Sequence, residues 1–442
     1  IMLAVVTIVM ASCTSDIEET TTTTGKNNIQ LVVGEFPAFG DSQTRAIGTP
    51  DPGKTSWAEG DELLLEIDNT SYGRHNATFT YNGSSWKLTS GELVYLEGDP
   101  AYISHVYYAP NYKWEAGKLV LKEGKDPGTD EYIEGNARIT GNGETITVSF
   151  AEATRKYSRL RIATIPNEQI TVDTEYFTPA GSSDMEQNGN YTLTSDEKGN
   201  AYLYGTFENN SEVTVKYREA ALTTYTFSQA TESAKSYALD ATVISANSAE
   251  EIKSAIEQKV ADGKTTIRLN LAPNAGTNEF MAIREAVKGA APNDLGTIEL
   301  TIIGVETIPE EAFYKMLQLK SVRMSDVKEI KKYAFKECQY LTVVEAPSLN
   351  KLYSGAFKKC DQLSKLTFGP INYADARNWP IFEYITPNID LILSDYQKEM
   401  IETDSYLYTA NNDRDYAGSD EHNSKNFLGR EFRSITCRYK VK

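Results

Sequence analysis

Histidine and cysteine are the residue types best able to act as nucleophiles, bases or zinc ligands, and this chain has few of them. Its 442 residues include 3 His and 4 Cys. The histidines His75, His105 and His422 are far apart in the sequence, and none lies close to Cys437. A thiol needs a neighbouring base to act as a nucleophile, and a zinc site needs grouped ligands. The sequence therefore predicts no catalytic residue, no metal site and no cofactor, and we expect a protein that is not an enzyme.

Cys13 is the one cysteine whose surroundings predict a reaction. An apolar run over residues 3–10, followed by small residues and Cys13, has the layout of a secretory signal. Met10-Ala11-Ser12-Cys13 resembles the bacterial lipobox, in which the cysteine receives a diacylglyceryl group and becomes the mature N-terminus. The resemblance implies a signal peptide at residues 1–12 and an outer-membrane lipid anchor, because two or three acyl chains hold stably. The alternative is an ordinary secretory signal with an incidental cysteine.

Residues 13–28 form a polar tract that contains five consecutive threonines, Thr20 to Thr24. Such a tract buries too little apolar surface to offset its ordering entropy, so we expect a flexible tether. The acidic residues Asp16, Glu18 and Glu19 resemble the surface-export signal of lipoproteins in anaerobic gut and oral bacteria. This resemblance implies a surface-exposed lipoprotein; the alternative is a plain solvated linker.

The charge of the chain restricts its partners. With 44 Lys and Arg against 62 Asp and Glu the net charge is -18, which repels phosphate backbones and argues against nucleic acid. No apolar run reaches the roughly 18 residues that a membrane-spanning helix needs. Residues 305–369 differ from the rest, because their 11 Lys and Arg outnumber 8 Asp and Glu. We expect most of these lysines on a solvated face, from which they could attract an acidic partner at short range.

Residues 29–244 have the composition of short strands and tight turns. Segments such as Gln30-Leu31-Val32-Val33, Glu62–Ile67 and Glu212–Tyr217 are rich in β-branched and apolar residues, and Asn-Gly pairs separate several of them. Many short strands at this spacing predict two β-sandwiches in tandem, at residues 29–152 and 153–244.

Four short motifs in this region resemble the fimbrillin family. They are Thr44-Arg45-Ala46; Ser56-Trp57-Ala58-Glu59-Gly60-Asp61; Thr147-Val148-Ser149-Phe150 ahead of Leu160-Arg161-Ile162; and Ser236-Tyr237-Ala238-Leu239. The resemblance implies transthyretin-like sandwiches and assembly with fimbrial subunits by strand donation, after a protease removes an N-terminal strand. Arg45 is the candidate processing site. An uncleaved arginine in an exposed loop is the favoured alternative.

Residues 245–297 predict an α/β cap for a new domain. Ser248-Ala249-Glu250-Glu251 has the pattern of a capping box, and a helix that ends at Asp262-Gly263 follows it. A strand at Thr266–Leu271, a helix at Glu279–Lys288 and a strand at Thr297–Ile302 come next. These elements would cover the first coil of whatever follows.

Residues 298–369 contain an internal repeat with a constant period of 22 residues. Apolar residues recur in register in the following sets: Ile308, Ile330 and Leu352; Phe313, Phe335 and Phe357; Met316, Cys338 and Cys360; Leu319, Leu341 and Leu363; and Val322, Val344 and Leu366. Each unit buries its apolar face only against the next, which predicts a short leucine-rich-repeat solenoid. Cys338 and Cys360 are then stacked in its interior, where two buried thiols are favoured over a disulfide.

The repeat pattern Ile-x-x-x-Ala-Phe-x-x-Cys-x-x-Leu-x-x-Val resembles the BspA-like leucine-rich repeats of bacterial surface antigens, which implies adhesion. Residues between the buried strand columns would form an open sheet surface, the candidate ligand site: Ser321, Arg323, Val343, Glu345, Lys365 and Thr367. Residues 370–442 would close the stack with a strand at Asp390–Leu393 and a last strand that holds Cys437.

The sequence as a whole indicates a multidomain, mainly β chain: two tandem transthyretin-like β-sandwiches followed by a short α/β leucine-rich-repeat solenoid with caps. The predicted function is a surface lipoprotein adhesin, either a fimbrial tip or accessory subunit or a stand-alone protein, whose ligand is a protein or glycan on host or neighbouring cells. The alternative is a surface glycan-binding lipoprotein of a nutrient uptake system.

Overall fold

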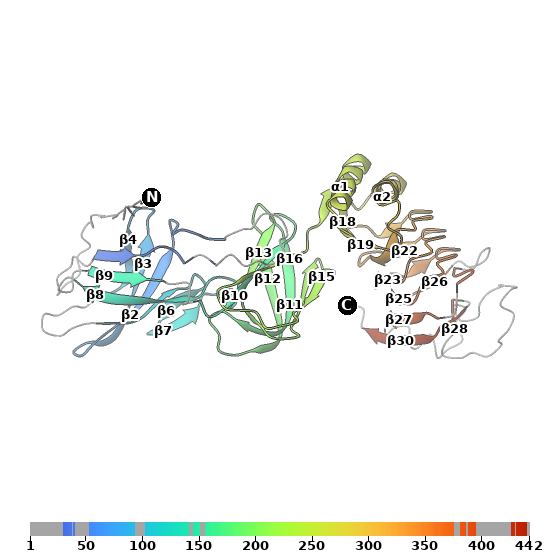
Figure 1. Ribbon diagram of the computed structural model, residues 1–442. Helices are drawn as coiled ribbons and strands as arrows, with labels where there is room; N and C mark the ends of the chain where they lie inside the picture. Colours follow the sequence, from blue (N-terminus) through green and yellow to red (C-terminus); the bar gives the residue numbers. More distant parts are fainter. Residues whose placement is uncertain are drawn as a thin grey trace, which may run out of the picture. The chain divides into compact units, whose positions relative to one another are not determined.

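The computed structural model describes most of the chain in two compact units (Figure 1). Described are residues 30–37, 39, 53–92, 102–140, 145–150, 155–374, 381–385, 388–394, 426–428 and 430–439. One unit comprises Ile1–Thr214 with Thr224–Asp240, and the other Val215–Thr223 with Ala241–Lys442. The predicted signal peptide, the tether, Cys13 and Arg45 lie outside the described residues.

The first unit begins with a seven-stranded sheet in the order β1-β9-β8-β5-β2-β3-β4. Its strands are β1 (Gln30–Val33), β2 (Glu62–Asn69), β3 (Gly73–Tyr81), β4 (Trp86–Gly91), β5 (Tyr102–Tyr108), β8 (Ile133–Thr140) and β9 (Thr145–Ser149). β1 joins β9 in parallel, whereas the other pairs are antiparallel. The hairpin of β6 (Tyr112–Glu115) and β7 (Lys118–Leu121) lies beside this sheet, where Tyr112 packs with Leu64 of β2. Both faces of β2 are therefore buried.

A second sheet follows, in the order β15-β14-β11-β13-β10-β16, with β12 paired to β11. Its strands are β10 (Ser158–Ala163), β11 (Gln169–Pro179), β12 (Glu186–Thr194), β13 (Asn200–Phe207), β14 (Glu212–Tyr217), β15 (Ala220–Thr226) and β16 (Ser236–Asp240). Buried and half-buried residues alternate along β13 and β14, as expected for strands with one face on a core. The predicted strands at Gln30–Val33 and Glu212–Tyr217 are confirmed with their bounds, and the one at Glu62–Ile67 extends to Asn69.

The second unit contains an eight-stranded parallel sheet in the order β17-β18-β19-β21-β23-β25-β27-β30. Its strands are β17 (Ile244–Ala246), β18 (Thr266–Leu271), β19 (Ile298–Ile303), β21 (Leu319–Arg323), β23 (Val343–Ala346), β25 (Lys365–Phe368), β27 (Asp390–Ser394) and β30 (Ser434–Tyr439). A four-stranded sheet of two-residue strands accompanies it: β20 (Thr307–Ile308), β22 (Glu329–Ile330), β24 (Lys351–Leu352) and β26 (Tyr373–Ala374). β28 (Asn426–Phe427) and β29 (Arg430–Glu431) form a further pair. Figure 1 shows the coils stacked one on the next.

The two helices cap this stack, and both begin where polar groups satisfy the first backbone N–H groups. α1 (Ala249–Ala261) starts after Ser248, whose side chain accepts from the Glu251 N–H at 3.3 Å. The Glu251 carboxylate accepts from the Asn247 N–H, one residue earlier than the predicted capping box requires. α2 (Thr277–Ala290) starts before the predicted Glu279, because the Gly276 N–H donates to the Glu279 carboxylate and forms the cap there. No helix of the described residues is long and apolar enough to span a membrane.

The predicted apolar columns form the core of the second unit. Phe313, Phe335 and Phe357 are fully buried and stacked, with successive ring centroids 5.0 and 5.3 Å apart. Phe382 continues the stack at 5.7 Å from Phe357, although it lies 25 residues further on rather than 22. The paired positions Lys365 and Asp390 of β25 and β27 are 25 residues apart, so a strict 22-residue period ends before this coil.

Candidate binding surface

The strand register places the six candidate ligand residues in two adjacent rows on the parallel sheet. One row is Ser321, Val343 and Lys365, and the other is Arg323, Glu345 and Thr367. Parallel strands lie about 4.8 Å apart, so neighbours within a row are in contact range. None of the six is buried, whereas Val322, Val344 and Leu366 between the rows are fully buried. The sequence prediction of an accessible face thus agrees with the strand geometry.

The rows continue beyond the residues that the repeat pattern identified. On β19, Glu299 pairs with Ser321 and Thr301 with Arg323. On β27, Asp390 pairs with Lys365, and β30 then places Ser434 beside Asp390. Sequence reasoning missed Asp390 because the coil before it is longer than 22 residues. Leu300 lies 22 residues before Val322 in the sequence, and this spacing is the signal that could have added Glu299 to the candidate surface.

Charges on this face are paired between neighbouring coils. The Arg323 Nε donates to Glu345 Oε2 at 2.8 Å, and Lys320 Nζ donates to Glu299 Oε1 at 2.8 Å. Lys365 is exposed and makes no ion pair with the described residues. The sheet face is therefore a mixed surface of half-exposed ion pairs, hydroxyls and one further cation, rather than a uniformly basic one. Such a surface fits a partner with both charged and neutral polar groups.

Asp390 on β27 is the carboxylate that pairs with a cation at the last strands of the sheet. Its carboxylate accepts from Arg433 Nε at 2.8 Å and from the Ser434 hydroxyl at 2.6 Å, and Arg433 Nη2 also contacts it. The hydrogen bonds from Arg433 and Ser434 lower the pKa of Asp390 to about 2. Asp390 is therefore ionised throughout the physiological range.

Residues 295–403 match the BspA type leucine rich repeat region, in 6 copies. This match runs past Gly369, where the strict 22-residue period ends. A search of curated proteins found no match.

A solved structure, that of a minor pilin from the Gram-positive pathogen Streptococcus agalactiae, is 9% identical to the chain. The alignment covers 48% of this chain and 94% of the pilin, with a TM-score of 0.17. At that TM-score the similarity carries no argument about fold or function.

The four-stranded sheet of the BspA type repeats carries its own ladder of ion pairs. Lys328 lies 2.6 Å from Glu306, and Glu329 lies 2.6 Å from Lys351 and 2.5 Å from Lys331. The hydrogen bonds from Lys331 and Lys351 lower the pKa of Glu329. Most of the lysines that make residues 305–369 basic are thus neutralised by a carboxylate on the same or the adjacent coil.

The two cysteines of the BspA type repeats are free, as predicted. Both are fully buried, and their Sγ atoms donate to the backbone oxygens of Phe313 and Phe335 at 3.0 and 3.1 Å respectively. Burial raises the pKa of the Cys338 thiol to about 12, so the reactive thiolate is disfavoured. Cys338 and Cys360 are structural groups. Within the described residues no cluster of three His, Cys, Asp or Glu side chains could hold a metal ion.

Proposed function

We propose that the protein is a cell-surface lipoprotein adhesin whose BspA type repeats bind a protein on host or neighbouring microbial cells. The observation that carries this proposal is the two-row face on the parallel sheet. Its residues are accessible, and the fully buried column of Val322, Val344 and Leu366 between the rows holds them in register. A rigid face with ordered charge pairs offers specificity at little ordering cost to a partner.

The proposed attachment to the cell is a lipid on Cys13, which would place the protein in the outer membrane with its repeats exposed outside. The lipobox-like residues and the acidic tether support this part of the proposal. Mass spectrometry of the mature native N-terminus tests it. An acylated Cys13 is expected, whereas an unmodified N-terminus elsewhere in residues 1–28 contradicts the anchor.

The proposed scaffold of the first unit is a pair of fimbrillin-like, transthyretin-like sandwiches that can receive a donated strand. β1 is at one end of the first sheet, and Leu31, Phe36 and Phe39 bring buried side chains to its core. Cleavage after Arg45 would release this segment and uncover a sheet edge. Because a folded repeat domain follows the sheets, the protein fits a fimbrial tip, an accessory subunit or a stand-alone adhesin. Purified protein is then expected not to polymerise, and filaments formed from it alone would contradict this placement.

Binding of the purified full chain to arrayed ligands tests the adhesin role. One array carries extracellular-matrix and bacterial surface proteins, and the other carries glycans. The proposal predicts binding to at least one immobilised protein. Binding confined to glycans would favour the alternative, a glycan-binding lipoprotein of an uptake system, and binding to neither array would contradict both.

A further inference from the structure

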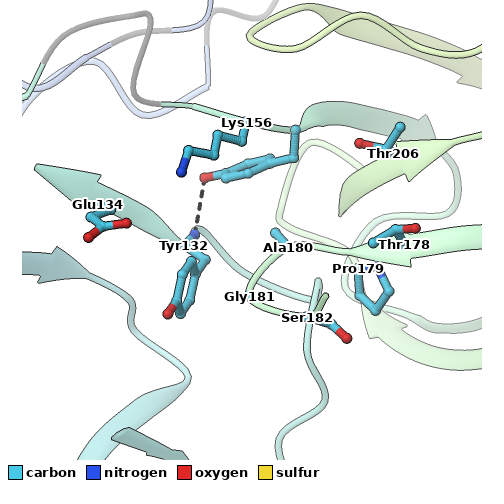
Figure 2. A pocket seen from close by; sticks show the side chains of 10 residues that line it. Tyr132, Glu134, Lys156, Thr178, Pro179, Ala180, Gly181, Ser182 and Thr206 are labelled. Carbon is cyan, nitrogen blue, oxygen red and sulfur yellow. Dashed lines mark hydrogen bonds between the residues drawn. The ribbon is translucent and has the colours of Figure 1, made fainter. Parts of the chain in front are cut away.

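A cavity of about 260 Å³ lies in the first unit, remote in sequence from the BspA type repeats. Four segments contribute to it: the start of β8, the residues ahead of β10, the end of β11 with its following turn, and β13. The lining residues are Tyr132, Glu134, Lys156, Tyr157, Thr178, Pro179, Ala180, Gly181, Ser182 and Thr206. Figure 2 shows the Glu134 carboxylate and the Lys156 amine toward one side and Thr178 and Thr206 toward the other.

Tyr132 gives the cavity a fixed aromatic wall. Its ring centroid is 5.0 Å from that of Tyr112 and 5.6 Å from that of Tyr107. Gly181 packs closely on the same rings, since a Cβ there would lie 2.7 Å from Tyr132 Cδ2 and 2.5 Å from the Tyr112 hydroxyl oxygen. The backbone N–H of Tyr132 donates to the Tyr157 hydroxyl at 3.0 Å, drawn as the dashed line in Figure 2. The ring is thus held before any ligand arrives.

The polar groups of the cavity divide into those already satisfied and those available. The Tyr157 hydroxyl accepts from the Tyr132 N–H and donates to the buried Glu131 carboxylate at 2.6 Å. Its proton is already used, so Tyr157 lines the cavity without donating to a ligand. Glu134 is held by His105 Nδ1 at 2.7 Å, and its second oxygen can accept from a ligand. Lys156 is exposed and makes no ion pair with any residue that the structure describes. Thr178 and Thr206 add half-buried hydroxyls.

These groups select the chemical class of the ligand. A carboxylate only accepts hydrogen bonds and an ammonium only donates them. A ligand that bonds to both Glu134 and Lys156 must therefore offer a donor to the first and an acceptor to the second. Sugar hydroxyls do this, while the apolar face of a sugar ring can cover the tyrosine. A simple hydrocarbon would bury Glu134 and Lys156 without partners, and a phosphate or sulfate would face the Glu134 charge. We propose that this cavity binds a single sugar residue of a glycan, independently of the BspA type repeats.

Saturation-transfer NMR on the full-length protein tests this proposal, with glucose, galactose, mannose and N-acetylglucosamine as probes. At least one sugar is expected to receive saturation. Its affinity is expected to fall about tenfold in Glu134→Ala, because a hydrogen bond to a charged group is lost. Lys156→Ala should weaken binding as well, and because Lys156 is exposed this variant decides the outcome if Glu134→Ala fails to fold.

Matched controls are Glu197→Ala and Lys198→Ala, which remove the same side-chain types from exposed positions outside the cavity. Both are expected to bind as the unaltered protein does. Arg323→Glu in the repeats should also leave the sugar signal intact, which separates this site from the proposed adhesin face. Absence of saturation transfer to all four sugars, or equal transfer in the cavity variants and the controls, would overturn the proposal.

Discussion

The two-row face of the repeats and the core of the first unit place ion pairs in different surroundings. In the repeats, Arg323 and Glu345 pair at the surface, with side chains 45% and 29% exposed. In the first unit, Arg155 and Glu131 pair at 2.7 Å with side chains only 0% and 5% exposed. Glu131 also accepts from the Tyr157 hydroxyl, and Arg155 contacts the Pro37 carbonyl. A stack of coils keeps charge outside its apolar columns, whereas the first unit encloses an ionic network.

The two arrangements follow from how each core is built. A repeat coil buries the same positions against its neighbours, so every coil has equivalent inward and outward residues. The first unit fills its core from segments distant in sequence, of which Phe36, Trp57 and Tyr108 meet edge to face. A buried ion pair is tolerated in such a core only while both partners are present. Removing one partner leaves an unpaired buried charge, which lowers the free energy of unfolding.

The largest expected effect is the loss of the buried carboxylate. Glu131→Ala leaves Arg155 without its carboxylate and should lower the free energy of unfolding of the first unit by about 3–5 kcal/mol. Urea unfolding followed by tryptophan fluorescence measures this in a Trp379→Phe background, because the other three of the four tryptophans, Trp57, Trp86 and Trp114, all lie in that unit.

The matched change in the repeats is Glu345→Ala, which also removes an arginine partner. Its pair is partly exposed, so a loss of only about 0–1 kcal/mol is expected, measured by circular dichroism during urea unfolding. If Glu131→Ala and Glu345→Ala lowered the free energy of unfolding equally, the proposed difference between the buried and the exposed ion pair would be contradicted.

An intermediate effect tests whether the coils are equivalent. Ile308 and Ile330 are fully buried at the same repeat position, and β20 and β22 place them side by side. Ile308→Val and Ile330→Val should each cost about 0.5–1.5 kcal/mol, since each removes one buried methylene group. The same unfolding experiment compares them. Clearly different losses would show that the coils do not share one environment.

A smaller effect is expected from acid, at the last strands. The folded-state pKa of Asp390 is about 2, below its ordinary value of 3.8, so the carboxylate stabilises the fold above the unfolded pKa. That contribution is lost as the pH falls from about 4 through 2. Asp390→Asn should flatten this part of the stability profile of the repeat unit, measured by thermal unfolding at a series of pH values. An unchanged slope would exclude the contacts from Arg433 and Ser434 as its source.

The sequence predicted the contacts inside the repeats but not the long-range contacts inside the first unit, and one physical difference explains both results. The 22-residue spacing of Phe313, Phe335 and Phe357 predicted their stacking, because a solenoid converts sequence period directly into spatial contact. Ser248 likewise predicted the start of α1 through a local contact. The pairing of β1 with β9 and the Arg155–Glu131 pair depend on distant segments that no local pattern connects. The sequence analysis did not connect Tyr132 to the cavity for that reason, since the Gly181 that packs on it lies in the turn after β11.

Matched charge reversals test the central claim, that the two-row face is the adhesive surface, most directly. Arg323 and Lys328 are similarly exposed, at 45% and 50%, and each pairs with a glutamate on an adjacent coil. Only Arg323 lies in the two rows. Binding of the full chain to its strongest arrayed protein ligand should fall at least about tenfold in Arg323→Glu and remain unchanged in Lys328→Glu. Equal binding by the two variants, or a loss confined to Lys328→Glu, would contradict the account.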